Sequence, residues 1–121
     1  MRQFLSFCDI VFCGENMEKL ETYEQFLKIK PNPLSIVMAK TETCTVCRPV
    51  LFRLEQLLQH YADVPFYTID IAKVDEFRGQ QLIFTVPTIL IFAEGQEILR
   101  ESRFVDFDRI KRLLDLATET H

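Results

Sequence analysis

Cys44 and Cys47 are the residues whose type and spacing are best suited to chemistry, in the sequence Cys44-Thr45-Val46-Cys47. Two intervening residues let the two sulfurs meet across one helical turn, near the Cα separation that a disulfide requires. The pair lies between a short apolar run and a segment with helical periodicity, so we expect it at a helix N-terminus. Free N–H groups and the helix dipole favour a thiolate there. The first cysteine of such a pair is usually the exposed nucleophile, and the second resolves the mixed disulfide.

Two other interpretations of these cysteines remain open. They could be buried thiols without a redox role, because free cysteine packs as a small hydrophobe. A structural zinc site would need four ligands, and the two histidines, His60 and His121, fall at a helix end and at the C-terminus. We therefore expect no metal site within one chain, although a site shared across a dimer stays open. Cys8 and Cys13 have a C-x4-C spacing that is not a redox motif, and we interpret them as incidental.

The elements that must position the cysteine pair follow from apolar periodicity and from turn residues. Helical spacing predicts helices, and short apolar runs predict strands buried on both faces. Lys-Pro-Asn-Pro at 30–33 ends the first helix, because neither proline can continue it. In chain order we expect a helix over 18–29, strands over 34–39 and 64–70 separated by a helix over 47–61, a short helix over 73–81, strands over 88–92 and 97–102, and a helix over 107–116.

This order predicts an α/β domain with a mixed four-stranded sheet flanked by helices. The strands over 34–39 and 64–70 are joined through a helix, so they should be parallel with a right-handed crossover. The last two strands are joined by a tight turn at 93–96, so they should be antiparallel.

A second motif, Thr85-Val86-Pro87-Thr88, comes directly before a buried strand. With it the sequence resembles the thioredoxin superfamily from about residue 18 to 118, which implies a thioredoxin-like fold. The resemblance implies a cis peptide bond before Pro87, packed beside the active disulfide. It also implies that Val86 offers backbone groups to an extended substrate chain. The implied sites are Cys44 and Cys47 for catalysis, and Thr43, Val86 and Pro87 for substrate binding.

The motif residues depart from the family pattern at several positions. Thr43 stands where typical thioredoxins carry tryptophan, and Thr45-Val46 stands where they carry Gly-Pro. The strand before the motif has no carboxylate, and Met38 falls close to the position of the buried acid. Proton transfer from Cys47 therefore lacks its usual helper. Glu42 is a candidate substitute, although a solvated loop residue is the simpler interpretation.

Pro49 comes earlier in the helix than the family's usual proline. We expect it to disturb the first turn, because it removes a backbone donor.

Length and composition are consistent with one domain, which we expect to span residues 17–121. Residues 1–16 are interpreted as an N-terminal extension that is disordered or lies upstream of the natural start. They contain Arg2 and an apolar stretch, but Asp9 interrupts it and no small-residue cleavage site follows. The net charge of −4 gives no electrostatic footprint for nucleic acid or anionic lipid. No apolar run approaches the roughly 20 residues of a membrane helix, so we expect no membrane association.

The function that these features predict is thiol–disulfide exchange by a cytoplasmic protein that reduces protein disulfides. No bound cofactor is needed, because the dithiol carries the two electrons; a thioredoxin reductase that recharges it is implied by the resemblance. One alternative is a thioredoxin-fold interaction module whose cysteine pair is redox-inactive or regulatory. Another is an oxidant or isomerase in an oxidising compartment, if residues 1–16 are an export signal.

Overall fold

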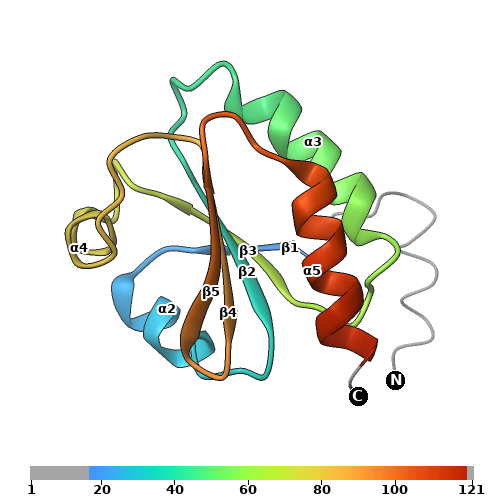
Figure 1. Cartoon of the computed structure of the whole chain (residues 1–121). Coiled ribbons are helices and arrows are strands. Elements are labelled where there is room, and N and C mark those ends of the chain that lie inside the picture. The colour runs from blue at the N-terminus through green and yellow to red at the C-terminus, as the bar shows by residue number, and fades with distance from the viewer. Residues whose placement is uncertain (1–16, 120–121) are drawn as a thin grey trace, which may run out of the picture.

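A mixed sheet with strand order β1-β3-β2-β4-β5 forms the centre of the computed structural model, which describes residues 17–119 (Figure 1). The elements of this range are β1 (Met17–Leu20), α2 (Tyr23–Ile29), β2 (Ser35–Lys40), α3 (Cys47–Leu58), β3 (Phe66–Asp70), α4 (Asp75–Gln80), β4 (Thr88–Ala93), β5 (Gln96–Ser102) and α5 (Phe107–Glu119). None of these helices is long and apolar enough to cross a membrane. The interpretations of residues 1–16, including Cys8 and Cys13, and of His121 concern positions outside the described residues.

Strand directions agree with the sequence prediction. β2 and β3 are parallel, and β4 is antiparallel to both β2 and β5. In the register, Ala39 faces Thr88 on β4, and Lys40 faces Asp70 on β3. The end of β2, the end of β3 and the start of β4 therefore meet at one edge of the sheet.

The sheet has five strands within the described residues, so the prediction of four was wrong by one. Residues 17–20 are the missing strand: they pair in parallel with residues 66–69 of β3 and do not belong to the first helix. That helix begins at Tyr23, because Thr22 caps it by accepting the Gln25 N–H at 3.1 Å, while the Gln25 side chain accepts the Glu21 N–H at 2.7 Å. The Thr-x-x-Gln pattern is a capping signal that marks this start in the sequence.

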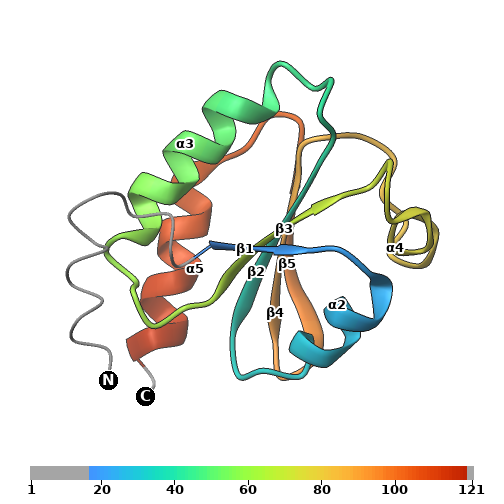
Figure 2. The same ribbon diagram turned by 180° about the vertical axis from the view of Figure 1, so that it is seen from behind.

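Helices cover both faces of the sheet (Figures 1 and 2). α3 and α5 lie on one face, and α2 and α4 lie on the other. Along β2, Ile36 and Met38 belong to the core cluster under α3 and α5, whereas Val37 and Ala39 belong to the cluster under α2 and α4. This double burial explains why the strand reads as a continuous apolar run. The helix that carries Cys47 therefore packs against a strand whose side chains are buried on both faces.

Pro49 does not disturb α3, contrary to the sequence prediction. The helix is continuous from Cys47 to Leu58, and Pro49 is its third residue. The N–H groups of the first turn have no intrahelical acceptor in any sequence, so the donor that proline lacks is not missed there.

Tyr61 links the loop after α3 to α5. Its hydroxyl donates a hydrogen bond to the carboxylate of Asp115, which also accepts one from Lys111 at 3.1 Å. The Tyr61 hydrogen bond, followed by that of Lys111, lowers the pKa of Asp115. Burial, followed by the hydrogen bond to Asp115, raises the pKa of Tyr61 to about 12.

Replacing Tyr61 by phenylalanine should lower the melting temperature by a few degrees at pH 7. Because the folded-state pKa of Asp115 is depressed, the stability that depends on its charge is present above the unfolded pKa and is lost as pH falls through the folded pKa. The deficit of Y61F relative to wild type should therefore shrink below about pH 4. Thermal melts from pH 7 to pH 3 check this, with Lys111→Gln as the variant that keeps the Tyr61 contact. A deficit that is constant across this range would contradict it.

Candidate functional site

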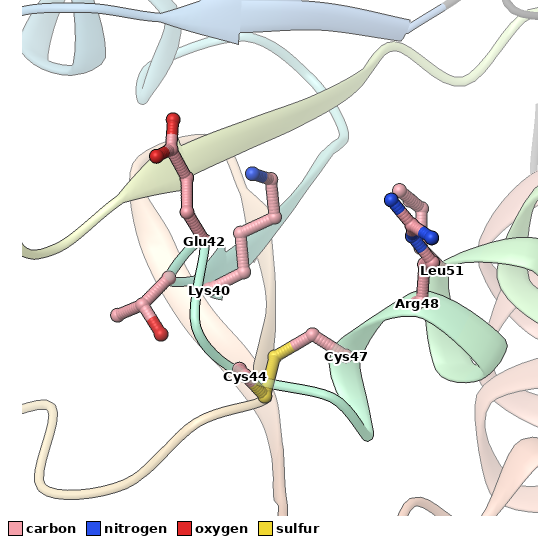
Figure 3. Close-up of a pocket in the computed structure, with 7 residues that line it drawn as sticks. Lys40, Glu42, Cys44, Cys47, Arg48 and Leu51 are labelled. Carbon is pink, nitrogen blue, oxygen red and sulfur yellow. A yellow bond between two sulfur atoms is a disulfide. The ribbon is translucent and has the colours of Figure 1, made fainter.

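Cys44 and Cys47 form a disulfide with a Cα–Cα distance of 5.4 Å (Figure 3). Cys47 is the first residue of α3, and its N–H donates to the Cys44 carbonyl at 3.3 Å. The Cys44 N–H donates in turn to the Thr41 carbonyl at 3.3 Å, so the segment between β2 and α3 is a pair of consecutive turns. Cys47 is 3% exposed, whereas Cys44 is only partly buried. The two sulfurs therefore differ in their access to solvent.

The Pro87 segment lies at the same edge of the sheet as the disulfide, because Thr88 pairs with Ala39 at the end of β2. Its Val86–Pro87 peptide bond is cis. The Pro87 carbonyl accepts the Arg103 N–H at 2.8 Å, and the Thr88 hydroxyl donates to the Thr85 carbonyl at 2.7 Å. Pro87 is buried and Val86 is half-buried, and Val86 packs against the same core cluster as Cys44. The loop is thus held by one hydrogen bond from Arg103 and by one within residues 85–88.

Thr43, the other residue expected to bind substrate, is exposed in the turn before Cys44. Its hydroxyl lies 3.4 Å from that of Thr41. The structure therefore places Thr43, Cys44, Cys47, Val86 and Pro87 at one edge of the sheet.

Met38 occupies the strand position below the disulfide at which the family resemblance implies a buried acid. It is fully buried, pairs with Thr68 on β3 and Ile89 on β4, and belongs to the same core cluster as Cys47. Glu42 does not replace that carboxylate: its side chain is 69% exposed and forms an ion pair with Lys73 at 3.1 Å. The Glu42 contact raises the pKa of Lys73. Glu42 is therefore a solvated surface residue.

A pocket of about 300 Å³ opens beside the disulfide. It is lined by residues 40–42 at the end of β2, by both cysteines, and by Arg48 and Leu51 of α3. In Figure 3 the disulfide lies at the base, with Lys40 and Glu42 on one side and Arg48 on the other. Lys40 was not among the site residues predicted from the sequence. Its position at the end of the buried run, four residues before Cys44, is the signal that could have found it.

The loop between β5 and α5 also belongs to this end of the molecule, through the contact between Arg103 and Pro87. It is held by Glu101, whose side chain is 8% exposed and pairs with Arg109 at 2.8 Å. The second Glu101 oxygen accepts the Asp106 N–H at 3.2 Å. This support presents Phe104, which is 85% exposed and was not predicted as a site residue from the sequence.

No group of three or more His, Cys, Asp or Glu side chains within residues 17–119 is arranged to hold a metal ion.

Comparisons with known proteins agree with this geometry. The thioredoxin family model matches residues 16–115. The thioredoxin-like protein YdfQ of Bacillus subtilis is 35% identical over 98 residues, which are 81% of this chain and 86% of that protein. Among solved structures, oxidised thioredoxin O2 from Arabidopsis thaliana superposes with a TM-score of 0.72 at 21% identity, covering 84% of this chain and 93% of the other. A Plasmodium falciparum thioredoxin gives 0.72 at 20% identity, with 82% and 97% covered.

Proposed function

The chain belongs to the thioredoxin family, and from that premise we propose that it reduces protein disulfides through Cys44 and Cys47. The observation that carries the proposal is the disulfide at the start of α3, with one partly exposed and one buried sulfur. A thiol–disulfide oxidoreductase needs this asymmetry, because one sulfur must reach the substrate and the other must react only inside the complex.

The reaction consumes the reduced dithiol. The Cys44 thiolate attacks one sulfur of a substrate disulfide, a Cys44–substrate bond forms, and the other substrate sulfur leaves as a thiol. The Cys47 thiolate then attacks Cys44, which restores the disulfide seen here and releases the second substrate thiol. Two electrons and two protons pass from the protein to the substrate. Regeneration requires an external reductant, and by its family the chain would receive the electrons from a thioredoxin reductase in the cytoplasm.

Substrate docking is proposed to use Thr43, Val86 and Pro87. Within the described residues, the backbone N–H and C=O of Val86 form no hydrogen bond. They remain available to an extended chain, which would add to them as a strand adds to a sheet edge. Phe84 is 88% exposed and lies two residues before Val86, and Phe104 follows the residue bonded to Pro87. Both supply apolar area beside the proposed docking site.

A redox-inactive interaction module is the second candidate function, and Met38 is the observation that favours it. A chain that has lost its disulfide chemistry has no need of an acid below Cys47. The absence of a carboxylate at position 38 is also compatible with activity if water accepts the Cys47 proton.

Titration of the Cys44–Cys47 pair against dithiothreitol and glutathione buffers tests the proposal. We expect a reversible two-electron transition near about −270 mV, the value of a reductase. A transition near about −120 mV would identify an oxidant instead. No reversible transition would overturn the enzyme proposal and favour the interaction module.

A further inference from the structure

The pocket beside the disulfide has a local charge opposite in sign to that of the whole chain. The chain carries a net charge of −4. Three of the pocket's lining residues are charged: Lys40, Glu42 and Arg48. The charge of Glu42 is compensated by Lys73 at 3.1 Å. Within residues 17–119, the side chains of Lys40 and Arg48 form no ion pair or hydrogen bond. Two cations without an ion-pair partner therefore line the pocket that contains the disulfide, and Lys40 also borders the neighbouring pocket with Glu21 and Asp70.

The position of Arg48 at the start of a helix adds to the positive charge of the pocket. It is the second residue of α3, a helix that has no acidic residue in its first turn. A cation at a helix N-terminus is repelled by the positive end of the dipole, whereas a carboxylate is stabilised there. The arrangement is unfavourable for the isolated domain and becomes favourable when an anion enters the pocket.

From this geometry we propose that the pocket between Lys40 and Arg48 binds a carboxylate of the substrate beside its disulfide sulfur. The inference rests on the proposed function and deepens it by assigning a substrate class: disulfides with an acidic group next to the reacting cysteine. Both sulfur-bearing residues, Cys44 and Cys47, line the same pocket, so a group bound there lies in the cavity that contains the bond to be exchanged. The carboxylate can come from an acidic protein segment or from a small anionic disulfide such as oxidised glutathione.

The test compares disulfide-linked peptide dimers that are identical except for one residue beside the cysteine, which is Glu, Gln or Lys. The rate at which each dimer oxidises the fully reduced protein is followed by acid quench, alkylation and mass measurement. In wild type we expect the Glu dimer to react faster than the Gln dimer, and the Lys dimer to react most slowly. Lys40→Gln and Arg48→Gln should each reduce the Glu-to-Gln rate ratio by about three- to tenfold.

Matched controls separate a binding role from a general one. Lys28→Gln on α2 and Arg112→Gln on α5 remove the same charges elsewhere and should leave the ratio unchanged. A cation that only stabilised the Cys44 thiolate would change the rates of all three dimers equally, so the ratio distinguishes the two effects. In 0.5 M salt the wild-type ratio should fall towards that of the variants, because an open pocket is screened.

The outcomes are distinguishable from a failure of the proposed function. If all three dimers react and the Glu-to-Gln ratio is the same in wild type, K40Q and R48Q, the carboxylate site is wrong and the oxidoreductase proposal stands. If no dimer reacts, the oxidoreductase proposal itself fails. Oxidised glutathione, tested in parallel, identifies the source. Dependence on Lys40 and Arg48 with glutathione as well as with peptides extends the site to small disulfides, and dependence with peptides alone assigns it to acidic protein segments.

Discussion

Replacing Cys47 by serine should leave a protein that captures substrate disulfides and cannot release them. Cys44 is the accessible sulfur, so the first attack proceeds, and the resolving thiol is then absent. A mixed disulfide between Cys44 and the substrate should accumulate on non-reducing gels, and multiple turnover should fall by roughly three orders of magnitude. Cys44→Ser should lose turnover to the same extent without accumulating an adduct. Intact-mass measurement after incubation with a peptide disulfide checks both variants.

The wild-type protein supplies an independent check of these roles. After reduction, brief exposure to iodoacetamide should label Cys44 well before Cys47, because only the first sulfur has substantial access to solvent. Peptide mapping reads the order directly. An adduct on Cys47 in the Cys44→Ser variant, or faster labelling of Cys47, would reverse the two roles.

The sequence located the sheet well where its strands are buried on both faces. Residues 35–40 and 88–93 are apolar on both sides of the sheet, so their continuous hydrophobicity is visible without any knowledge of neighbours. β1 was missed because Met17–Leu20 is short and mostly exposed, with Leu20 as its single buried residue. Its strand character depends on pairing with β3, nearly fifty residues away in the chain, and that pairing has no local signal.

The residues of the candidate site likewise fall into those that could be predicted from the sequence and those that could not. The cysteine pair and the Val86-Pro87 segment can be recognised in the sequence because each is a short local motif. Lys40 and Arg48 were not recognised as two sides of one pocket, because they meet only when the end of β2 and the start of α3 are folded together. Phe104 was missed for the same reason: it is placed by a hydrogen bond between Arg103 and Pro87, which are distant in the chain.

Met38 is the remaining departure from the family pattern whose physical consequence can be measured. Its side chain is fully buried between β3 and β4 partners, in the cluster that contains Cys47. An aspartate introduced there would be smaller than methionine and would have to be buried as an acid. Burial penalises the charged form of a carboxyl group, so its pKa in the folded protein should be raised above about 3.9, the unfolded value.

Met38→Asp should therefore destabilise the oxidised protein by about 3–5 kcal/mol at neutral pH, from the lost packing and from the buried polar group. The sign of its pH dependence follows from proton uptake. Between the unfolded pKa and the raised folded pKa, the folded state binds more protons than the unfolded state, so stability falls as pH rises through that window. Urea unfolding at pH 4 and pH 8 measures the difference. Met38→Asn, which is polar but does not titrate, should show no matching change in its deficit.

The same pair of variants tests whether Cys47 needs a nearby base. If proton removal from Cys47 limits the second step, Met38→Asp should release substrate from the mixed disulfide faster than Met38→Asn at pH 7, once both are compared under conditions where they are folded. The advantage should disappear at low pH, where the aspartate is protonated. Equal release rates at both pH values would show that water suffices as the proton acceptor in this chain, and that the apolar strand below the disulfide favours stability without slowing exchange.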